Sequence, residues 1–416
     1  MSPCKDDRNE RDPIRSTSVG LVVLLLMSIL ASQPGLGAQN GVRYTSDPSA
    51  DHVYDEIATL SQWYRYLDSP GHRNAEAHIL SVFDDYGLNT TVQEYTAQRL
   101  DGSVRAANVL GLLEGTDPTR CLVIGGHYDN NQRSSKGAYD NAVGVGTVLE
   151  LARLFAQVHE DAPPMSMIFA AWDSEEGGGA GSNHYLGNPV WDIEIVGYIN
   201  LDMFSLSYPV RNSIPGSSEE YFKLNVYTSP VQDFSIYQQV EYSDGTLENF
   251  TAFRDVLENI TYEQFGHPSQ WVIVQDDTAG VSDHRFFVER SIPAVWFRGM
   301  NEKPREAGDL NEIAFKHTPV DTLETMERYA GGKQELLKGI DTGLSIAYAL
   351  ANQWIEHINE TSLLDVDGSD AGATDVDGGA TGGFAVGASV LILLLIPVVF
   401  IAWRRRAASH RPQPTT

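Results

Sequence analysis

Cysteine is scarce in this chain, and so is positive charge. Among 416 residues there are two cysteines, Cys4 and Cys121, and only 29 lysines and arginines against 56 aspartates and glutamates. Cys4 precedes an apolar segment near the amino terminus, whereas Cys121 opens an apolar run in the middle of the chain. A disulfide between the two is therefore not expected, and a disulfide framework is excluded.

The formal net charge of -27 argues against nucleic acid as a partner, because binding to a polyanion requires positive charge. Only seven of the basic residues are lysine. An acidic excess of this size keeps a protein soluble when salt screens repulsion, which is typical of high-salt habitats. An ordinary acidic secreted enzyme is the alternative that the same composition allows.

Apolar runs near both ends of the chain have the features of membrane signals. Three arginines precede residues 19–31, a run with the length of a signal-peptide core. Residues 384–403 are twenty residues without a charge, and three consecutive arginines follow them. This pattern predicts a transmembrane helix with its basic flank on the inner side of the cell membrane. We therefore expect the residues between the two segments to be extracellular.

These segments divide the chain into five parts. We predict a signal peptide or N-terminal membrane segment over residues 1–38, a catalytic domain over 39–362, a tether over 363–383, the transmembrane helix over 384–403 and a basic cytoplasmic tail over 404–416. The tether is rich in Asp, Gly, Ala and Thr and has no aromatic residue and no base, so we expect it to be disordered. One catalytic domain is favoured because the motifs below span almost all of it.

The body of the chain alternates short apolar runs with helix-like stretches. Helices are predicted over residues 55–67, 74–86, 143–159 and 323–354, and strands over 107–115, 121–126, 165–172, 193–202, 271–276 and 292–297. The apolar runs lack period-two alternation, which is typical of strands that are buried on both faces. We therefore predict an α/β domain with a mostly parallel mixed central sheet and helices on both faces.

Six residues in this domain have the composition of a metal centre. They are His127, Asp140, Glu175, Glu176, Asp202 and His317. Several of them end or follow predicted strands, and in such sheets ligands bind beyond the carboxyl ends of the strands. Two imidazoles and three carboxylates can hold two divalent metals, with one carboxylate spanning them and a sixth left to handle a proton. The set indicates a metallohydrolase.

Each motif by itself also has an ordinary structural interpretation. Asp140 precedes a predicted helix and could cap its amino terminus, and His317 could be a loop histidine. Glu175 and Glu176 could form a solvated acidic loop. Two neighbouring carboxylates at a strand end would however repel unless cations or a proton share the site, and the three glycines that follow permit a tight turn that aims both inward.

Two further carboxylates are candidates for orienting the histidines. Asp129 lies two residues beyond His127, and an extended backbone puts both side chains on one side. Asp129 can therefore orient the imidazole and support catalysis from there. Asp321 follows His317 in "HTPVDT" and could hold that imidazole in the same way.

Together the motifs resemble the co-catalytic zinc peptidases of family M28. The resemblance runs from about residue 50 to residue 355 and is carried by "ANVLG", "GGHYDN", "GAYDNAVGVG", "WDSEEGGGAGS", "YINLDM", "SDHRFF" and "HTPVDT". It implies a zinc exopeptidase fold, peptide substrates and two zinc ions, with other divalent metals as alternatives. By position it implies that His127 and Asp202 bind one ion, that Glu176 and His317 bind the other, that Asp140 bridges them and that Glu175 is the general base.

The chain departs from the family pattern just before the last histidine. Many family aminopeptidases resemble one another in having an aromatic hydroxyl there, whereas Phe315 and Lys316 precede His317 in this chain. His284 in "SDHRFF" matches a family segment near the cleft. We expect it to line the cleft at most, because a histidine at the start of a helix is more often structural. Residues 205–280, which are rich in Tyr, Phe and acidic residues, are predicted to form the specificity region.

The sequence thus predicts a membrane-tethered exopeptidase that acts outside the cell, with an aminopeptidase as the first hypothesis. The alternatives are a carboxypeptidase of the same fold, a glutaminyl cyclase-like transferase and a catalytically inactive binding domain. The cyclases look like single-zinc sites that lack the first histidine, and inactive relatives usually lose ligands. In this chain His127 is intact and all six positions are filled.

Overall fold

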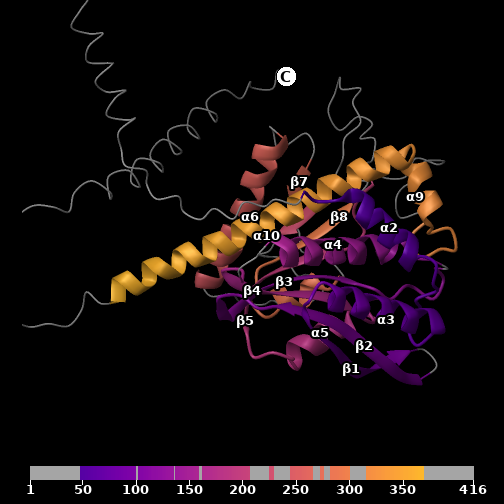
Figure 1. Cartoon of the computed structure of the whole chain (residues 1–416), viewed down its shortest axis with the longest axis horizontal. Coiled ribbons are helices and arrows are strands. Elements are labelled where there is room, and N and C mark those ends of the chain that lie inside the picture. Colours follow the sequence, from indigo (N-terminus) through magenta and orange to yellow (C-terminus); the bar gives the residue numbers. More distant parts are fainter. Residues whose placement is uncertain are drawn as a thin grey trace, which may run out of the picture. The chain divides into compact units, whose positions relative to one another are not determined.

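A mixed eight-stranded sheet runs through the described residues of the unit Met1–Ser362 (Figure 1). The computed structural model describes residues 47–99, 102–134, 136–158, 162–206, 224–228, 244–265, 272–275, 282–299 and 315–369. Within these residues the strands are β1 (Asn89–Arg99), β2 (Gly102–Leu113), β3 (Asp117–His127), β4 (Met165–Trp172), β5 (Glu194–Leu201), β6 (Leu224–Thr228), β7 (Val272–Gln275) and β8 (Ala294–Gly299). Their order in the sheet is β1-β2-β4-β3-β5-β8-β6-β7.

Parallel strands occupy the middle of the sheet. β3 pairs in parallel with both β4 and β5, and β5 pairs in parallel with β8. On one side β1 and β2 form an antiparallel pair, and β2 is also antiparallel to β4. On the other side β6 is antiparallel to β8 and parallel to β7. The predicted α/β class with a mixed central sheet is therefore confirmed.

Helices pack on this sheet (Figure 1). They are α2 (Ala50–Leu60), α3 (Pro70–Asp85), the π-helical turn η1 (Ala138–Ala142), α4 (Val143–Val158), α5 (Ala180–Gly187), α6 (Asp244–Phe265), α8 (His284–Val288), α9 (Leu323–Ala330) and α10 (Lys333–Ser369). The first two begin earlier than predicted because serine side chains cap them. Ser49 accepts a hydrogen bond from the backbone N–H of His52, and Ser69 accepts one from that of His72.

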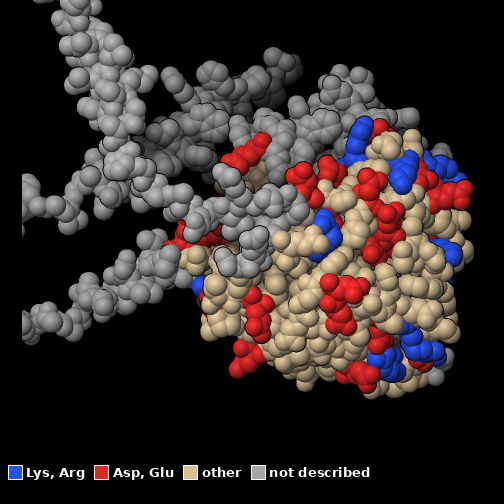
Figure 2. Space-filling model, in the orientation of Figure 1, with Lys and Arg blue, Asp and Glu red and all other residues tan. Residues whose placement is uncertain are grey.

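The acidic excess of the chain is visible on the surface of the described residues. Figure 2 shows aspartate and glutamate side chains spread over the visible face, with fewer lysines and arginines between them. An acidic excess of this kind raises solubility and disfavours binding to polyanions.

Both faces of the central strands are buried, and alternate residues serve opposite faces. In β3, Leu122 and Ile124 belong to one apolar cluster, whereas Cys121 and Val123 belong to another. The first cluster includes side chains of α2, α3, α4 and α10, and the second includes side chains of α5 and α8. Two-sided burial explains why these strands are continuous apolar runs without alternating polarity.

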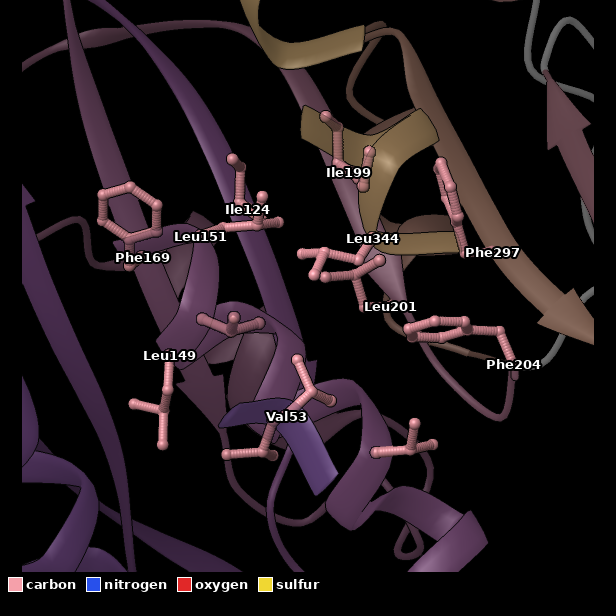
Figure 3. Close-up of a cluster of buried hydrophobic side chains, with 14 of the residues drawn as sticks. Val53, Ile124, Leu149, Leu151, Phe169, Ile199, Leu201, Phe204, Phe297 and Leu344 are labelled. Atoms are coloured by element: carbon pink, nitrogen blue, oxygen red, sulfur yellow. The ribbon is translucent and has the colours of Figure 1, made fainter. Parts of the chain in front are cut away.

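The larger cluster joins the sheet to the helices on one of its faces. Figure 3 shows fully buried side chains from β3, β4, β5, α2, α4 and α10, among them Ile124, Phe169, Ile199, Val53, Leu149 and Leu344. Each such side chain contributes about 1.5 to 3 kcal/mol relative to leaving it exposed. These contacts hold the strand ends and the helix ends that carry the candidate site.

The helix predicted over residues 323–354 is in fact two helices. α9 ends at Ala330 and α10 begins at Lys333. Gly331 and Gly332 separate them with φ angles of 91° and 127°, a region of backbone conformation that favours glycine. The N–H of Gly332 donates to the carbonyl of Glu327 at 2.7 Å, which caps the end of α9.

α10 continues to Ser369 and so includes residues 363–369, which we predicted as the start of the tether. Within the described residues, no helix has both the length and the apolar character needed to cross a membrane. The predicted N-terminal segment, the transmembrane helix and the basic tail lie outside the described residues. Their prediction stays untested.

The start of α4 lies unusually close to the end of β5. A Cβ atom on Gly144 would lie 2.1 Å from the carbonyl oxygen of Leu201 and 2.5 Å from Asn141 Oδ1. The amide of Asn141 donates to that same carbonyl at 2.8 Å and accepts from the Gly144 N–H at 3.0 Å. Glycine at this position therefore lets the segment before α4 reach the carboxyl end of β5.

We predict that Gly144→Ala lowers the free energy of unfolding by about 1 to 3 kcal/mol, because the added methyl group meets the backbone carbonyl of Leu201 and the hydrogen-bonded side chain of Asn141. Denaturant unfolding of the purified protein measures the change. Gly187→Ala is the matched control, since a Cβ there meets nothing within 4 Å. Equal stability of the two variants would contradict the close approach of α4 and β5.

Candidate metal centre

The structure brings all six predicted residues together at the carboxyl ends of three neighbouring strands. His127 is the last residue of β3, and Asp202 directly follows β5. Glu175 and Glu176 follow β4, which pairs with β3. Asp140 comes from η1, and His317 comes from the segment before α9.

Two groups of ligand-type atoms share Asp140. In the first group, His127 Nε2 lies 3.3 Å from Asp140 Oδ1 and 3.4 Å from Asp202 Oδ1. In the second, His317 Nε2 lies 2.9 Å from Asp140 Oδ2 and 3.0 Å from Glu176 Oε2. In each group the potential ligand atoms all lie within 4.8 Å of one another. The two oxygens of one carboxylate thus face two separate clusters.

The clustered atoms are buried, and several lack a hydrogen-bond partner. Those without one are His127 Nε2, Asp140 Oδ2, Glu176 Oε1, Asp202 Oδ1 and His317 Nε2. Buried polar atoms in proteins are nearly always hydrogen-bonded, so such a concentration of exceptions requires an explanation. Imidazole nitrogens and carboxylate oxygens are the ligands of zinc and related divalent cations. The residues present therefore fit two such ions.

Glu175 lies beside the first group without belonging to either. Its Oε2 is 3.9 Å from His127 Nε2. Burial raises the pKa of Glu175 well above its ordinary value, and the negative charges of Asp202 and Asp283 add to this rise while His127 opposes it. A carboxylate with a raised pKa is more basic than that of an ordinary glutamate.

The shared carboxylate has the opposite electrostatic character. Burial by itself raises the pKa of Asp140, but Lys316, His127 and His317 together lower it well below its ordinary value. Lys316 Nζ lies 3.4 Å from Asp140 Oδ2. Burial also lowers the pKa of Lys316, yet the surrounding carboxylates raise it above its ordinary value. Asp140 is therefore ionised and has a cation beside it.

Asp129 connects the end of β3 to the glutamate pair. Its carboxylate accepts the backbone N–H groups of Glu175 and Glu176 at 3.0 and 3.2 Å. His127 Nδ1 lies 3.1 Å from the backbone oxygen of Asp129 and 3.4 Å from its Oδ1. The predicted contact with the imidazole is thus present, but the carboxylate also holds the turn that carries both glutamates. The Asn131 side chain donates to Glu176 Oε2 at 3.0 Å.

Asp321 does not hold His317, in contrast to our expectation. Its carboxylate is fully buried and accepts the backbone N–H groups of Tyr139 and Asp140 at 2.8 and 3.2 Å. These two groups lie at the start of η1, where the chain has no earlier helical turn to accept them. The segment that follows His317 therefore positions Asp140 through its backbone.

A buried chain of hydrogen bonds orients Asp202. Tyr198 donates to Asn200 Oδ1 at 2.8 Å, Asn200 Nδ2 donates to Ser282 Oγ at 2.8 Å, and Ser282 donates to Asp202 Oδ2 at 2.7 Å. The Trp172 N–H donates to Tyr198 and begins the chain. The hydroxyl groups of Tyr198 and Ser282 both donate within this chain of hydrogen bonds. Asp202 Oδ1 receives none of them and faces His127. Sequence reasoning missed Ser282, although it opens the quoted segment "SDHRFF".

His284 follows Ser282 by two residues and is buried. Its ring stacks on that of Trp296, with the centroids 4.9 Å apart. Burial lowers the pKa of His284 to about 3, so the imidazole is neutral. Both ring nitrogens lack a hydrogen-bond partner among the described residues. It belongs to neither ligand group and is not among the residues that line the described cleft.

A buried arginine that sequence reasoning also missed holds the loop between His127 and Asp140. The guanidinium of Arg65 is fully buried and donates to the carbonyl groups of Leu60, Tyr128, Lys136 and Gly137. Burial lowers its pKa to about 10, so it stays charged at neutral pH. Four backbone acceptors at 2.7 to 2.8 Å replace the water that burial removes.

A cleft of about 540 Å³ opens beside the second ligand group. Its lining comes from the end of β1, the loop after β3 and the turn after β4, and it consists of Tyr66, Leu67, Gln98, Arg99, Asp129, Asn130, Asn131, Gln132, Arg133, Ser174, Glu176, Gly177 and His317. The predicted specificity region, residues 205–280, lies largely outside the described residues. This cleft is a space next to the candidate centre that a substrate can enter.

Comparison with known proteins places the chain among peptidases and their relatives. Transferrin receptor protein 2 of Homo sapiens is 27% identical over 310 residues, which cover 72% of this chain and 32% of the receptor. A probable zinc metalloprotease of Phaeosphaeria nodorum is 29% identical over 235 residues, which cover 49% of this chain and 45% of that protein. The chain spans about a third of the length of the transferrin receptors that it matches.

Solved structures show the same fold at low sequence identity. Porphyromonas gingivalis glutaminyl cyclase superposes with a TM-score of 0.56 at 16% identity, covering 74% of this chain and 100% of that one. An aminopeptidase from Aneurinibacillus superposes with a TM-score of 0.53 at 15% identity, covering 74% and 94%. A Zn-dependent exopeptidase from Parabacteroides distasonis gives 0.52 at 19% identity, covering 73% and 99%.

A family model supplies the assignment. The model of Peptidase family M28 matches residues 108–333, more than half of the chain. All six residues of the candidate metal centre fall inside the matched range, and so does the buried hydrogen-bond chain that orients Asp202. The chain belongs to peptidase family M28.

Proposed function

We propose that this chain is a co-catalytic di-zinc exopeptidase that hydrolyses terminal peptide bonds, and that it acts as an aminopeptidase. The observation that carries the proposal is the position of Asp140, whose two oxygens face two separate groups of ligand-type atoms. A single-metal centre would need only one such group. Membership of the zinc peptidase family supports zinc as the metal.

Five residues supply the ligands in this proposal. His127 and Asp202 would hold one ion, Glu176 and His317 would hold the other, and Asp140 would contribute to both. When bound, the two ions would lower the pKa of a water and polarise the carbonyl of the scissile bond. Ser282 donates to Asp202 Oδ2 and leaves Oδ1 facing His127. Asn131 donates to Glu176 Oε2, the oxygen that faces His317, so both carboxylates keep a defined direction.

Glu175 acts as the general base. It belongs to neither ligand group, and its raised pKa suits a carboxyl group that takes up a proton from the attacking water and delivers it to the leaving amine. The backbone N–H of Glu175 is fixed by Asp129, which limits the movement of the carboxylate. The Lys316 ammonium group is a donor and a cation beside the centre, and it can stabilise negative charge that develops on the substrate carbonyl.

Acidic groups around the centre suit the free ammonium group of a peptide, which favours an aminopeptidase over a carboxypeptidase. A glutaminyl cyclase-like transferase is the second candidate, because the fold is shared with the Porphyromonas gingivalis cyclase. Two complete ligand groups, with His127 in one of them, favour the hydrolase. They also speak against an inactive binding domain. A panel of aminoacyl reporters, N-blocked dipeptides and glutaminyl peptides distinguishes these activities directly.

We also propose that the protein is anchored at the cell surface. Residues 384–403 anchor the protein in the membrane through a single helix, and the tether keeps the peptidase domain outside the cell. The support comes from the uncharged run and the three arginines that follow it. Peptides outside the cell are then the substrates.

We expect two divalent ions per chain in the active protein, because the two groups of ligands share Asp140. Elemental analysis of the purified protein measures the number, and a strong chelator should abolish activity that added zinc restores. Glu176→Gln should lower the metal content. Glu194→Gln is the control, since Glu194 is exposed at the opposite end of β5. One ion or fewer in the fully active protein would refute the two-metal centre.

We expect Glu175→Gln to reduce turnover by roughly a hundredfold to ten-thousandfold, because the amide keeps the shape but cannot accept the proton of the water. The metal content should stay at the wild-type value, and this separates the general base from the ligand Glu176. Turnover and elemental analysis of the same preparation test both points. Metal loss in Glu175→Gln together with full occupancy in Glu176→Gln would reverse the two assignments.

We expect mild proteolysis of intact cells to release an active soluble enzyme by cleavage within residues 370–383. This segment follows α10 and has a composition that disfavours a packed core. A tag placed after Thr416 should be protected on the inner side until the cells are lysed. Digestion of that tag from outside, with activity that stays cell-bound, would rule out the outward-facing topology.

A further inference from the structure

The cleft beside the second ligand group has basic and amide side chains opposite the candidate centre. Arg99 comes from the end of β1 and Arg133 from the loop after β3. This is unusual in a chain with a net charge of -27. The two acidic lining residues are already engaged, since Asp129 accepts two backbone N–H groups and Glu176 contacts Asn131 and His317.

Arg133 lies on a turn that is connected to the centre. Asn131 Oδ1 accepts the backbone N–H of Arg133 at 3.1 Å, and the Asn131 carbonyl accepts that of Ser134 at 3.0 Å. The side-chain amide of the same Asn131 donates to Glu176 Oε2. One asparagine therefore positions both the turn that carries Arg133 and a candidate metal ligand. The place of Arg133 relative to the centre is set by two hydrogen bonds on one side chain.

The guanidinium of Arg133 has no hydrogen bond and no ion pair with the part of the chain that the structure describes. The side chain is exposed and lines the cleft. Arg99 is held on the cleft wall, since it donates to the Leu67 carbonyl at 3.2 Å and lies 5.7 Å from the centroid of the Tyr66 ring. The cleft thus combines one anchored cation with one that is available to a ligand.

A third lining residue has unused hydrogen-bonding capacity. The side chain of Asn130 is fully buried, and neither its nitrogen nor its oxygen has a partner among the described residues. Its backbone N–H donates to the carbonyl of Arg65, which fixes its position. A buried amide without a partner costs free energy unless a ligand or water satisfies it. In this cleft it adds an N–H donor to the two guanidinium groups.

We propose that this cleft binds a carboxylate of the peptide substrate, with Arg133 as the principal contact and Arg99 and Asn130 as supporting contacts. The planar guanidinium donates two parallel hydrogen bonds to a carboxylate, which gives direction as well as charge. The inference rests on the proposed peptidase function and adds a substrate class to it. The carboxylate is either the free carboxyl terminus of a short peptide or the side chain of an aspartate or glutamate.

The location of the cleft suits this role. It borders Glu176 and His317 but contains neither His127 nor Asp202, so it lies on one side of the shared Asp140. A substrate whose scissile bond lies at the centre extends one flanking residue into the cleft. A volume of about 540 Å³ is within the range of ligand pockets. The positive charge of Arg133 then makes substrate binding depend on the charge of that flanking residue.

Two pairs of peptides, each matched except for the charge of one group, test the proposal: Leu-Ala with Leu-Ala-amide, and Leu-Asp-amide with Leu-Asn-amide. The quantity measured is kcat/KM, with kcat and KM determined separately. For the wild type we expect a preference for Leu-Ala over its amide if the site binds a terminus, or for Leu-Asp-amide over Leu-Asn-amide if it binds a side chain. Arg133→Gln should reduce kcat/KM for the preferred substrate by roughly tenfold to a hundredfold, chiefly by raising KM.

The uncharged peptide amides supply the internal reference. Arg133→Gln should leave their hydrolysis unchanged, and Arg133→Lys should restore only part of the preference, because it keeps the charge but loses the planar pair of donors. Arg120→Gln is the control variant, since Arg120 lies toward the opposite end of β3. Hydrolysis of all four peptides without a charge preference, or an equal loss on all four in Arg133→Gln, would overturn the carboxylate site and leave the peptidase function intact. No hydrolysis of any peptide by the metal-loaded wild type would overturn the proposed function itself.

Discussion

The sharing of Asp140 between two groups of buried polar atoms is the constraint on which the rest of the structure depends. Its oxygens lie 3.3 Å from His127 Nε2 and 2.9 Å from His317 Nε2. One short side chain can do this only if three distant parts of the chain meet within a few ångströms. Two local hydrogen bonds position Asp140. Asp321 accepts its backbone N–H, and the next residue, Asn141, donates to the Leu201 carbonyl at the end of β5.

Electrostatics sets a second requirement at the same place. Several carboxylates buried close together raise one another's pKa, and burial adds to that effect, as Glu175 and Glu176 illustrate. The pKa values of Asp140 and Asp202 are lowered instead, because imidazoles lie beside both carboxylates. Lys316 helps to keep Asp140 ionised. The cluster therefore contains carboxyl groups of two kinds. The pKa is lowered at Asp140 and Asp202 and raised at Glu175 and Glu176, and of these four only Glu175 lies outside both ligand groups.

Most of the residues that orient the centre act through hydrogen bonds from outside it. Ser282 holds Asp202, Asn131 holds Glu176, and Asp129 holds the backbone of the glutamate pair. Arg65 holds the loop between His127 and Asp140 by binding four carbonyl groups. Since these partners are buried, each bond also removes a desolvation cost. The same hydrogen-bond network connects the loop of Arg133 to the centre. It would therefore position both the residue proposed to select the substrate and the residues proposed to catalyse its hydrolysis.

The sequence by itself determined the class of the fold and the residues of the candidate centre. Apolar runs stop where strands stop, so the order of residues alone assigns His127, Asp202 and the glutamate pair to strand ends. Tertiary structure decided which groups meet. In the folded protein Asp321 accepts the backbone N–H of Asp140 instead of holding His317, and Ser282 donates to Asp202, which is eighty residues away in the sequence. Arg133 lies in the cleft. Hydrophobic periodicity reports only burial along one segment, whereas these contacts depend on the register between strands and on close approaches such as that of Gly144.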